Sequence, residues 1–384
     1  MSQLRIAIVR GPNLNRWEMQ NFLPLQNDFR LTGITSLRHN FSIDEIPFEV
    51  QSLFSVGQAL RSRFLRSALA RRWGDYHDLQ GLSRVLAGYD IVHSAETSYY
   101  CTYQAAVAKK RQGFKLAVTV WENIPFSMNF PATRRMKEVV NRETDLFIAV
   151  TERSRQTLIL EGAPPERVQV VMPGVDTAHF HPQRRDPALV RRFGLDDSDL
   201  VVLFVANLYW EKGIFDLLVA FRRVWDRLGR PGRLKLLIAG KGKEHARIVE
   251  WIGLLGLTDR ALLIGGHPYS LMPAIHSLAD VFVLPSIPTR AWQEQFGYVL
   301  VESMASGKAV VTSRCGSIPE VVGEAAVLTD PADFLGLTTA LEDVLTDSAR
   351  REELGRLGRE RAISQFSIEP VSKKLRSLYS ALLS

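Results

Sequence analysis

Short apolar runs alternate along the first half of the chain with longer segments whose apolar residues recur at helical spacing. The short runs, which are often β-branched, cover residues 4–9, 90–93, 115–120, 146–150 and 168–172. The helix-like segments between them include residues 97–112 and 152–161. This alternation predicts a parallel sheet covered by helices on both faces. Ligands of such sheets bind beyond the carboxyl ends of the strands, so the loops there are the first candidates for a site.

The second half of the chain repeats this pattern without repeating the sequence. Its strand-like runs cover residues 200–205, 234–239, 261–264, 281–284 and 309–312. Residues 181–199 contain proline and many charges but no strand pattern, which is typical of a linker. The chain is therefore expected to form two α/β domains, over residues 1–180 and 200–365, followed by a helix with an apolar stripe over residues 366–384.

Composition supports two folded domains and argues against several other classes of protein. The 384 residues are 46% apolar and 23% charged, which suits two hydrophobic cores and is unlike a disordered chain. The longest apolar run, residues 200–208, is too short to span a bilayer, and the first residues show no secretory signal. The two cysteines and scattered histidines favour neither a disulfide framework nor a metal site. A soluble, cytoplasmic protein is expected.

The net charge of +7 indicates an anionic partner, and much of the excess is concentrated in residues 51–74. This stretch contains no acidic residue, and its arginines are Arg61, Arg63, Arg66, Arg71 and Arg72. Its apolar residues at helical spacing are Leu53, Val56, Leu60 and Phe64. Two interpretations remain open: a surface helix with solvated arginines, or a basic amphipathic helix that contacts an anionic membrane or acceptor. No nucleic-acid-binding motif accompanies the stretch, so nucleic acid is not an expected partner.

A candidate anion site lies in residues 294–307. Gly297 lets the backbone turn, and the residues after it are good helix formers. A helix start presents unpaired N–H groups and a partial positive charge, which suits a phosphate. Glu294 precedes this helix and Glu302 lies within it, so a carboxylate near each end could accept hydrogen bonds from hydroxyls. Taken singly, each carboxylate is more often a solvated surface residue.

With its flanks, this stretch resembles the signature of a known family. Glu294 and Glu302, separated by seven residues, and the Phe-Gly pair between them are similar to the signature of family 4 of the retaining GT-B glycosyltransferases. Residues 317–322 continue that family's pattern. The resemblance implies two Rossmann-like domains whose parallel sheets face each other across a cleft, with residues 366–384 crossing back to the first domain. It also implies transfer with retained configuration and no essential metal or other cofactor.

The resemblance further implies a donor site for a nucleoside-diphosphate sugar, held mainly by the second domain. Glu294 would hold hydroxyls of the donor sugar, and Glu302 would hold the ribose. Lys212 follows a strand and is placed to neutralise the diphosphate as negative charge develops on it, so Lys212 and Glu294 are the expected catalytic residues. The expected donor-binding residues are Gly11, Asn15, Asn207, Lys212, Gly240, Gly242, Gly266, Glu294, Phe296, Gly297, Tyr298 and Glu302.

Two of these positions depart from the family's pattern. Asn207 stands where the family normally has an arginine, which predicts weaker diphosphate binding or compensation by another basic residue. The loop of Gly11 and Asn15 stands where the family usually has a double glycine. Asparagine tolerates unusual backbone angles and offers side-chain hydrogen bonds, so a binding role remains open beside ordinary loop chemistry.

The expected acceptor contacts follow strands of the first domain. His93 ends one strand-like run, and either packing or acceptor contact would suit it. Trp121 and Glu122 stand where many family members have His followed by Asp. A tryptophan face stacks well against a sugar ring or an apolar acceptor, and Glu122 is a candidate base or hydroxyl acceptor.

The sequence thus predicts a retaining glycosyltransferase that moves a hexosyl group from a UDP- or GDP-linked sugar. The expected acceptor is a glycan, a lipid-linked molecule or a small molecule, in cell-envelope polysaccharide synthesis. Contact with an anionic membrane through residues 51–74 would place the enzyme peripherally on the inner face of the membrane. Two alternatives stay open: a nucleotide-sugar epimerase on the same fold, and a non-catalytic module that binds an anionic ligand or nucleic acid.

Overall fold

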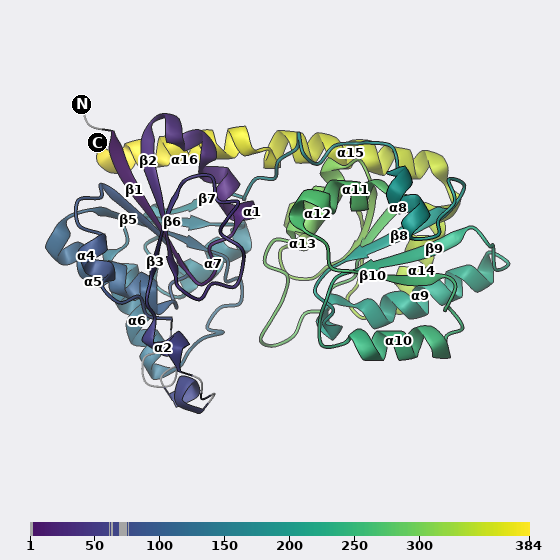
Figure 1. The fold of residues 1–384 in the computed structure, drawn as a ribbon, viewed down its shortest axis with the longest axis horizontal. Coiled ribbons are helices and arrows are strands. Elements are labelled where there is room, and N and C mark those ends of the chain that lie inside the picture. Colours follow the sequence, from purple (N-terminus) through teal and green to yellow (C-terminus); the bar gives the residue numbers. More distant parts are fainter. Residues whose placement is uncertain (1–2, 61, 63, 69–74, 76) are drawn as a thin grey trace. The chain divides into compact units, whose positions relative to one another are not determined.

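The computed structural model of the chain describes residues 3–60, 62, 64–68, 75 and 77–384. It divides into two compact units, Met1–Gly174 with Ile368–Ser384 and Val175–Ser367 (Figure 1). Each unit is built on one sheet whose paired strands all run parallel. The fold class expected from the alternating pattern, two Rossmann-like α/β domains, is therefore confirmed.

The first unit contains, within the described residues, a seven-stranded sheet in the order β3-β2-β1-β4-β5-β6-β7. Its strands are β1 (Leu4–Gly11), β2 (Phe29–Ser36), β3 (Glu49–Leu53), β4 (Ile91–Ala95), β5 (Lys115–Val120), β6 (Leu146–Ala149) and β7 (Val168–Val170). Its helices are α1 (Arg16–Met19), η1 (Gln20–Asn27), α2 (Val56–Ala59), α4 (Leu82–Val85), α5 (Tyr100–Gln112), α6 (Pro131–Glu143), α7 (Glu152–Leu160), η2 (Pro165–Arg167) and α16 (Ile368–Leu383).

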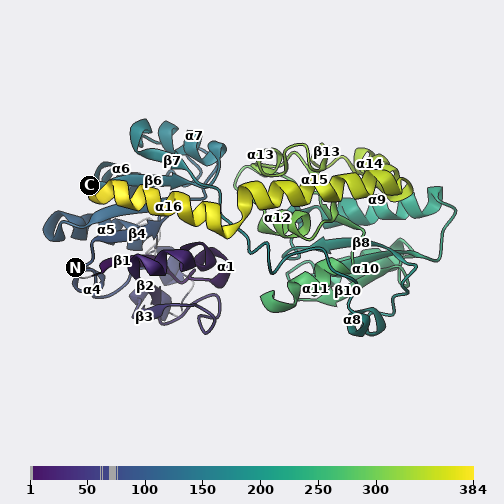
Figure 2. The same cartoon turned by 90° about the horizontal axis from the view of Figure 1, so that it is seen from above.

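The two faces of this sheet bury separate hydrophobic cores. Along β1, Ile6 and Ile8 belong to one core whereas Ala7 and Val9 belong to the other, as the two-residue period of a strand requires. The core of Ile6 and Ile8 is completed by α16, whose Tyr379 is fully buried. Figure 2 shows α16 running along this unit. The last helix of the chain is therefore part of the first unit.

The second unit contains, in the part of the chain described, a six-stranded sheet in the order β10-β9-β8-β11-β12-β13. Its strands are β8 (Leu200–Val205), β9 (Leu234–Ala239), β10 (Ala261–Gly265), β11 (Val281–Leu284), β12 (Ala309–Ser313) and β13 (Val327–Thr329). Its helices are α8 (Pro187–Arg192), η3 (Trp210–Lys212), α9 (Ile214–Arg227), α10 (His245–Leu254), η4 (Tyr269–Leu271), α11 (Met272–Ser277), α12 (Tyr298–Ala305), α13 (Ile318–Val322), α14 (Phe334–Thr346) and α15 (Ser348–Phe366).

Central strands β8 and β11 are apolar throughout because helices cover both faces of the sheet. Helix α9 buries Ile214, Leu217, Phe221 and Val224, which lie on one stripe of the helix. The structure corrects the expected linker: residues 181–199 lie inside the second unit and contain α8. Proline and charge density suggested a linker, but Leu189 and Leu195 on either side of the end of α8 are buried.

The basic stretch 51–74 also differs from its expected single helix. Its start is the end of β3, which pairs with β2 over Glu49–Leu53, and α2 ends at Ala59 with Leu60 in an extended conformation. Residues 64–68 are helical again. Arg61, Arg63, Arg71 and Arg72 lie outside the described residues. No helix among the described residues is both long and apolar enough to cross a membrane.

Candidate active site

The strand order of the second unit brings Lys212 and Glu294 together. Strands β9 and β10 extend the sheet on one side of β8, and β11, β12 and β13 extend it on the other side. The strand order therefore reverses between β8 and β11, and ligands of such sheets bind beyond the carboxyl ends of the strands at this switch point. Lys212 lies in η3 after β8, and Glu294 lies in the loop after β11. Lys212 Nζ is 2.8 Å from Glu294 Oε2, although 82 residues separate them in the chain.

This ion pair is held by two further side chains of the second unit. Ser286 Oγ donates a hydrogen bond of 3.2 Å to Glu294 Oε2. The Trp292 ring lies against the lysine, with Nζ 4.3 Å from the ring centroid, a cation–π distance. The side chains of Lys212 and Glu294 are only 17% and 12% exposed. A cation at this place is therefore both oriented and shielded from water, which strengthens its interaction with an anion.

Helix α12 begins beside this pair. Its N-cap is Gly297, which has a φ of 84° and so turns the chain into the helix. Phe296 is buried against Phe366 and Tyr298, which anchors the turn in the core of the unit. Glu302 lies within the helix and is 6% exposed. Phe296, Gly297 and Tyr298 thus follow Glu294 closely in the chain, and Glu302 lies further along α12.

Three expected donor-site glycines follow the neighbouring strands β9 and β10. A Cβ on Gly240 would lie 1.9 Å from the Ala206 carbonyl oxygen, and one on Gly242 would lie 2.4 Å from the Leu208 carbonyl oxygen. Glycine is therefore required here for packing of the β9 loop against the β8 loop, whatever else it contacts. Gly266 and Asn207 are both exposed at the carboxyl edge of the sheet.

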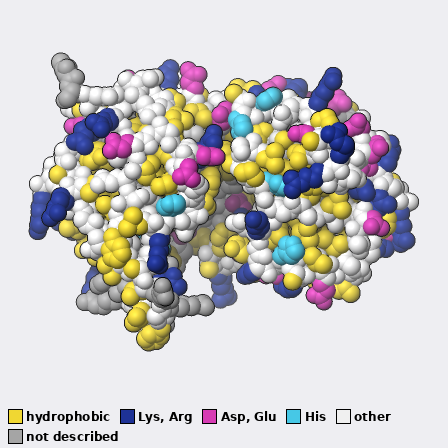
Figure 3. Space-filling view, viewed as in Figure 1, with side chains coloured by type: hydrophobic (Ala, Val, Ile, Leu, Met, Phe, Trp, Pro, Cys, Tyr) yellow, Lys and Arg dark blue, Asp and Glu magenta, His cyan; other side chains and the backbone are white. Residues whose placement is uncertain are grey.

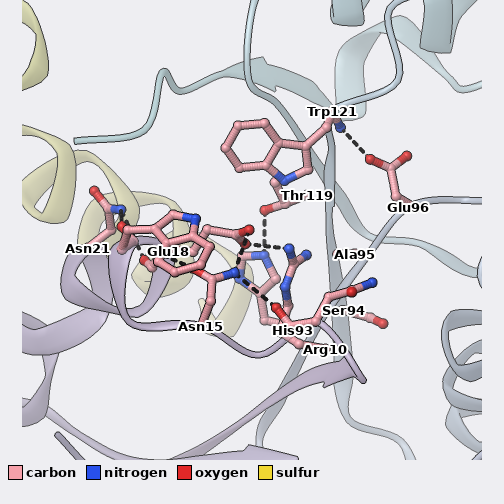
Figure 4. A network of polar contacts seen from close by, with 12 residues as sticks. Arg10, Asn15, Glu18, Asn21, His93, Ser94, Ala95, Glu96, Thr119 and Trp121 are labelled. Atoms are coloured by element: carbon pink, nitrogen blue, oxygen red, sulfur yellow. Dashed lines mark hydrogen bonds and ion pairs between the residues drawn. The ribbon is translucent and has the colours of Figure 1, made fainter. Parts of the chain in front are cut away.

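The first unit presents a corresponding edge between β1 and β4 (Figure 4). Buried Arg10, at the end of β1, forms an ion pair with Glu18. The Asn15 amide nitrogen donates 2.9 Å hydrogen bonds to Glu18 Oε1 and to the Asn13 carbonyl oxygen. Its oxygen accepts from the Glu18 N–H at 2.9 Å. Asn15 is thus the N-cap of α1, and a donor contact of this residue stays a prediction. Gly11, the last residue of β1, has a φ of 52°.

Two of the residues expected at the acceptor site make hydrogen bonds within the first unit. His93 is 2% exposed, with Nε2 2.6 Å from Thr119 Oγ1 and Nδ1 hydrogen-bonded to Tyr379 Oη of α16. Burial, aided by the charge of Arg10, lowers the pKa of His93 to about 3, so the ring is neutral. Glu122 accepts hydrogen bonds from the N–H groups of Asn123 and Ile124 and from Ser127 Oγ. His93 is therefore packed inside the unit, one of the two roles expected for it, whereas an acceptor contact of the half-buried Glu122 stays a prediction.

Glu96 is the residue that sequence reasoning passed over. It follows β4 with a φ of 59°, a left-handed conformation that is strained for a glutamate, and such strain is concentrated at functional sites. Its side chain is buried, and Oε1 accepts a 2.7 Å hydrogen bond from the Trp121 N–H. Burial raises the pKa of the Glu96 carboxyl to about 7, with the nearby Glu122 acting in the same direction. Neither backbone strain nor this burial can be read from a sequence.

Comparison with known families identifies the class of enzyme. Residues 186–361 match the family model described as Glycosyl transferases group 1, and residues 43–179 match the model described as Glycosyltransferase Family 4. The chain belongs to the GT-B glycosyltransferases of family 4. No group of three or more His, Cys, Asp or Glu side chains in the described parts of this glycosyltransferase is arranged to hold a metal ion.

Known relatives are similar over most of the glycosyltransferase. A GDP-mannose-dependent alpha-(1-6)-phosphatidylinositol monomannoside mannosyltransferase of Mycolicibacterium smegmatis is 29% identical over 270 residues, 69% of each chain. An MMP alpha-(1->4)-mannosyltransferase of Mycolicibacterium hassiacum is 28% identical over 384 residues, 98% of this chain and 86% of the relative. The crystal structure of Anabaena Alr3699/HepE with UDP has a TM-score of 0.80 at 17% identity, covering 99% of this chain and 100% of that one.

The raised pKa of Glu96 predicts that the stability of this glycosyltransferase depends on pH. A folded pKa of about 7, above the ordinary 4.5, means that the folded state keeps its proton while the unfolded chain loses it. The free energy of unfolding of the first unit should therefore fall as pH rises from about 4.5 to about 7, by up to about 3 kcal/mol. Denaturant unfolding between pH 5 and 8 should show that Glu96→Gln removes this fall. Glu138→Gln, at an exposed site on α6, should retain it.

Proposed function

We propose that the enzyme transfers a hexosyl group, with retention, from a nucleoside-diphosphate sugar bound by the second unit. The observation that carries this proposal is the shielded Lys212–Glu294 pair at the switch point between β8 and β11. A half-buried cation beside the start of α12 suits an anionic diphosphate, and the carboxylates of Glu294 and Glu302 suit hydroxyl groups.

Each group has a distinct role in this reaction. The bond from the anomeric carbon to the diphosphate breaks with its electrons passing to the diphosphate, where Lys212 and the N–H groups at the start of α12 stabilise the charge. The acceptor hydroxyl forms the new bond on the same face, and its proton passes to the departing phosphate oxygen. Glu294 holds hydroxyls of the donor sugar, and Glu302 holds the ribose. Asn207 supplies a neutral hydrogen bond where the family has a cation, so Lys212 carries most of the charge neutralisation.

The acceptor is bound by the first unit, at the carboxyl ends of β1 and β4. Arg10, Glu96 and Trp121 are the polar and aromatic groups gathered there (Figure 4). They suit a hydroxyl-rich acceptor, either a glycan or a lipid-linked intermediate of the cell envelope. The relatives support this class, because the name of one specifies GDP-mannose as donor and a phosphatidylinositol mannoside as acceptor.

Ligand-induced stabilisation tests the donor assignment. A ligand that binds only the folded state raises its stability, by about 2.7 kcal/mol at a concentration of 100 Kd. Thermal unfolding of the wild type should therefore shift upward with either UDP or GDP and not with CMP or a short DNA duplex. Glu302→Ala should lose most of this shift. An upward shift with DNA alone would contradict the donor site and favour a non-catalytic anion-binding module.

We further propose that the first unit attaches peripherally to an anionic membrane, on the inner face. Phe54, Phe64 and Leu65 are 50%, 80% and 48% exposed, and Arg66 lies beside the last two. Figure 3 shows hydrophobic side chains gathered at this end of the unit, next to the residues that are not described. Exposed aromatic side chains among arginines suit the interface of a bilayer that carries negative charge.

Vesicle binding tests the membrane proposal. Each cation near an anionic surface contributes about 1 kcal/mol, so changing Arg61, Arg63 and Arg66 together to glutamine should weaken binding to phosphatidylglycerol vesicles about 10²-fold. Sedimentation should show no binding to phosphatidylcholine vesicles at the same salt concentration.

A matched triple variant controls for the loss of net charge alone. It changes three exposed arginines of the second unit to glutamine, Arg223 on α9 with Arg350 and Arg356 on α15, and should leave vesicle binding unchanged. Equal binding of the wild type and of the variant at Arg61, Arg63 and Arg66 would contradict the proposal.

A further inference from the structure

The imidazole of His276 lies behind the Glu302 carboxylate in the interior of the second unit. His276 is on α11 and is fully buried, and its Nε2 is 3.7 Å from Glu302 Oε2. Its Nδ1 is 2.9 Å from the hydroxyl of Ser303, the residue that follows Glu302 on α12. Two neighbouring residues of one helix therefore face the two nitrogens of a single ring.

The Glu302 carboxylate has hydrogen-bonding capacity that the described residues do not use. None of the described residues donates a hydrogen bond to either of its oxygens, and its side chain is only 8% exposed. His276 Nε2 is buried and likewise makes no hydrogen bond within the described residues. Burying a carboxylate without hydrogen bonds is unfavourable, so this arrangement suits a ligand that brings donors with it. Two adjacent hydroxyls, as on a ribose, supply two O–H donors to one carboxylate.

Ser303 and two aromatic rings hold the imidazole in one orientation. The ring centroids of Phe180 and Phe282 are 5.8 and 5.7 Å from that of His276. When the Ser303 hydroxyl donates to Nδ1, the ring proton lies on Nε2 and faces Glu302. The 3.7 Å between Nε2 and Glu302 Oε2 is too long for a hydrogen bond, so the ring orients the carboxylate through its N–H dipole.

We propose that His276 is a positioning residue. Ser303 fixes the orientation of its ring, and the ring orients the Glu302 carboxylate so that it can bind the ribose hydroxyls of the donor nucleotide. The inference rests on the proposed role of Glu302 as the ribose-binding group. It adds that discrimination between ribose and deoxyribose depends on a buried residue that does not touch the ligand. A merely structural histidine would affect the binding of ribose and deoxyribose nucleotides equally.

The test compares Kd values for UDP and GDP with those for their 2′-deoxy counterparts, by calorimetry. A hydrogen bond to a charged group is worth about 1.5–3 kcal/mol, so the wild type should prefer the ribonucleotide about tenfold or more. His276→Phe keeps a ring between Phe180 and Phe282 but has no nitrogen, and should reduce the preference to about twofold. His276→Gln should restore much of it, because its amide can donate to Glu302 while accepting from Ser303.

Three further variants separate the possible outcomes. Ser303→Ala should also reduce the preference, which keeps the test decisive if His276→Phe fails to fold. His245→Phe, at an exposed site on α10, should leave the preference unchanged. The inference is overturned if His276→Phe and Ser303→Ala keep the wild-type preference while Glu302→Gln loses it. If Glu302→Gln itself keeps the preference, or the wild type has none, the ribose-binding role of Glu302 fails, and the inference fails with it.

Discussion

Lys212→Ala is expected to lower kcat/KM for glycosyl transfer by about 10²- to 10³-fold, the usual loss when one preorganised group that stabilises developing charge is removed. Lys212 Nζ is held by Glu294 at 2.8 Å and by the ring of Trp292 at 4.3 Å, so it needs no reorganisation to meet a diphosphate. The loss should be large because Asn207 offers no second cation in the β8 loop. Steady-state kinetics with the UDP- or GDP-linked hexose that binds would measure it.

A matched lysine at the other end of the sheet controls for general damage. Lys235 lies near the start of β9, at the amino edge, where its Nζ donates to the Asp259 carbonyl oxygen at 3.0 Å. Lys235→Ala should change kcat/KM less than about twofold, as expected for a site that touches neither substrate nor catalytic group. Suppose that Lys212→Ala retained more than a third of the wild-type kcat/KM and the wild-type melting temperature. The lysine would then not stabilise the leaving group.

The fold could be predicted from sequence where strands are uniformly apolar. Buried central strands such as β8 and β11 are continuous apolar runs in the sequence. The predicted ends of both agree with the observed ends to within one residue. Strand β2 contains Gly33 and three Thr or Ser residues, and β3 is mostly polar, so neither stood out. In β3, the pairing with β2 prevails over the helical spacing that Leu53 makes with the residues after it.

The candidate site could be predicted only where its signal is local. Glu294, Gly297 and Glu302 belong to one loop and helix, so their spacing carries the information. The groups that hold them, Ser286 and His276 among others, come from other elements and are recognisable only in three dimensions. Asn15 and Glu122 lie in loops and His93 lies in β4, and all three make hydrogen bonds within the first unit. A residue's loop can be read from a sequence, whereas its remaining hydrogen-bonding capacity cannot.

The second large effect is expected at Glu294, where alanine should lower kcat about 10²- to 10³-fold and glutamine somewhat less. The carboxylate both orients Lys212 and, in the proposed reaction, binds hydroxyls of the donor sugar. Glutamine preserves the size and an oxygen for Ser286 Oγ, but it removes the charge that holds the lysine. The loss of kcat in Glu294→Gln would therefore measure the effect of the missing charge on Lys212, and the further loss in Glu294→Ala would measure the effect of the missing side-chain volume and oxygen.

A double-mutant cycle decides whether Lys212 and Glu294 act as one unit. Groups that act together give strongly non-additive losses, so Lys212→Ala combined with Glu294→Gln should cost no more than about threefold beyond the worse single variant. Independent contributions would instead multiply, to about 10⁴-fold or more. The control pair is Arg227 and Glu342, which are 2.7 Å apart on the surface of the same unit and should not affect kcat in any combination. Multiplied losses at Lys212 and Glu294 would mean that their contact is not what organises the site.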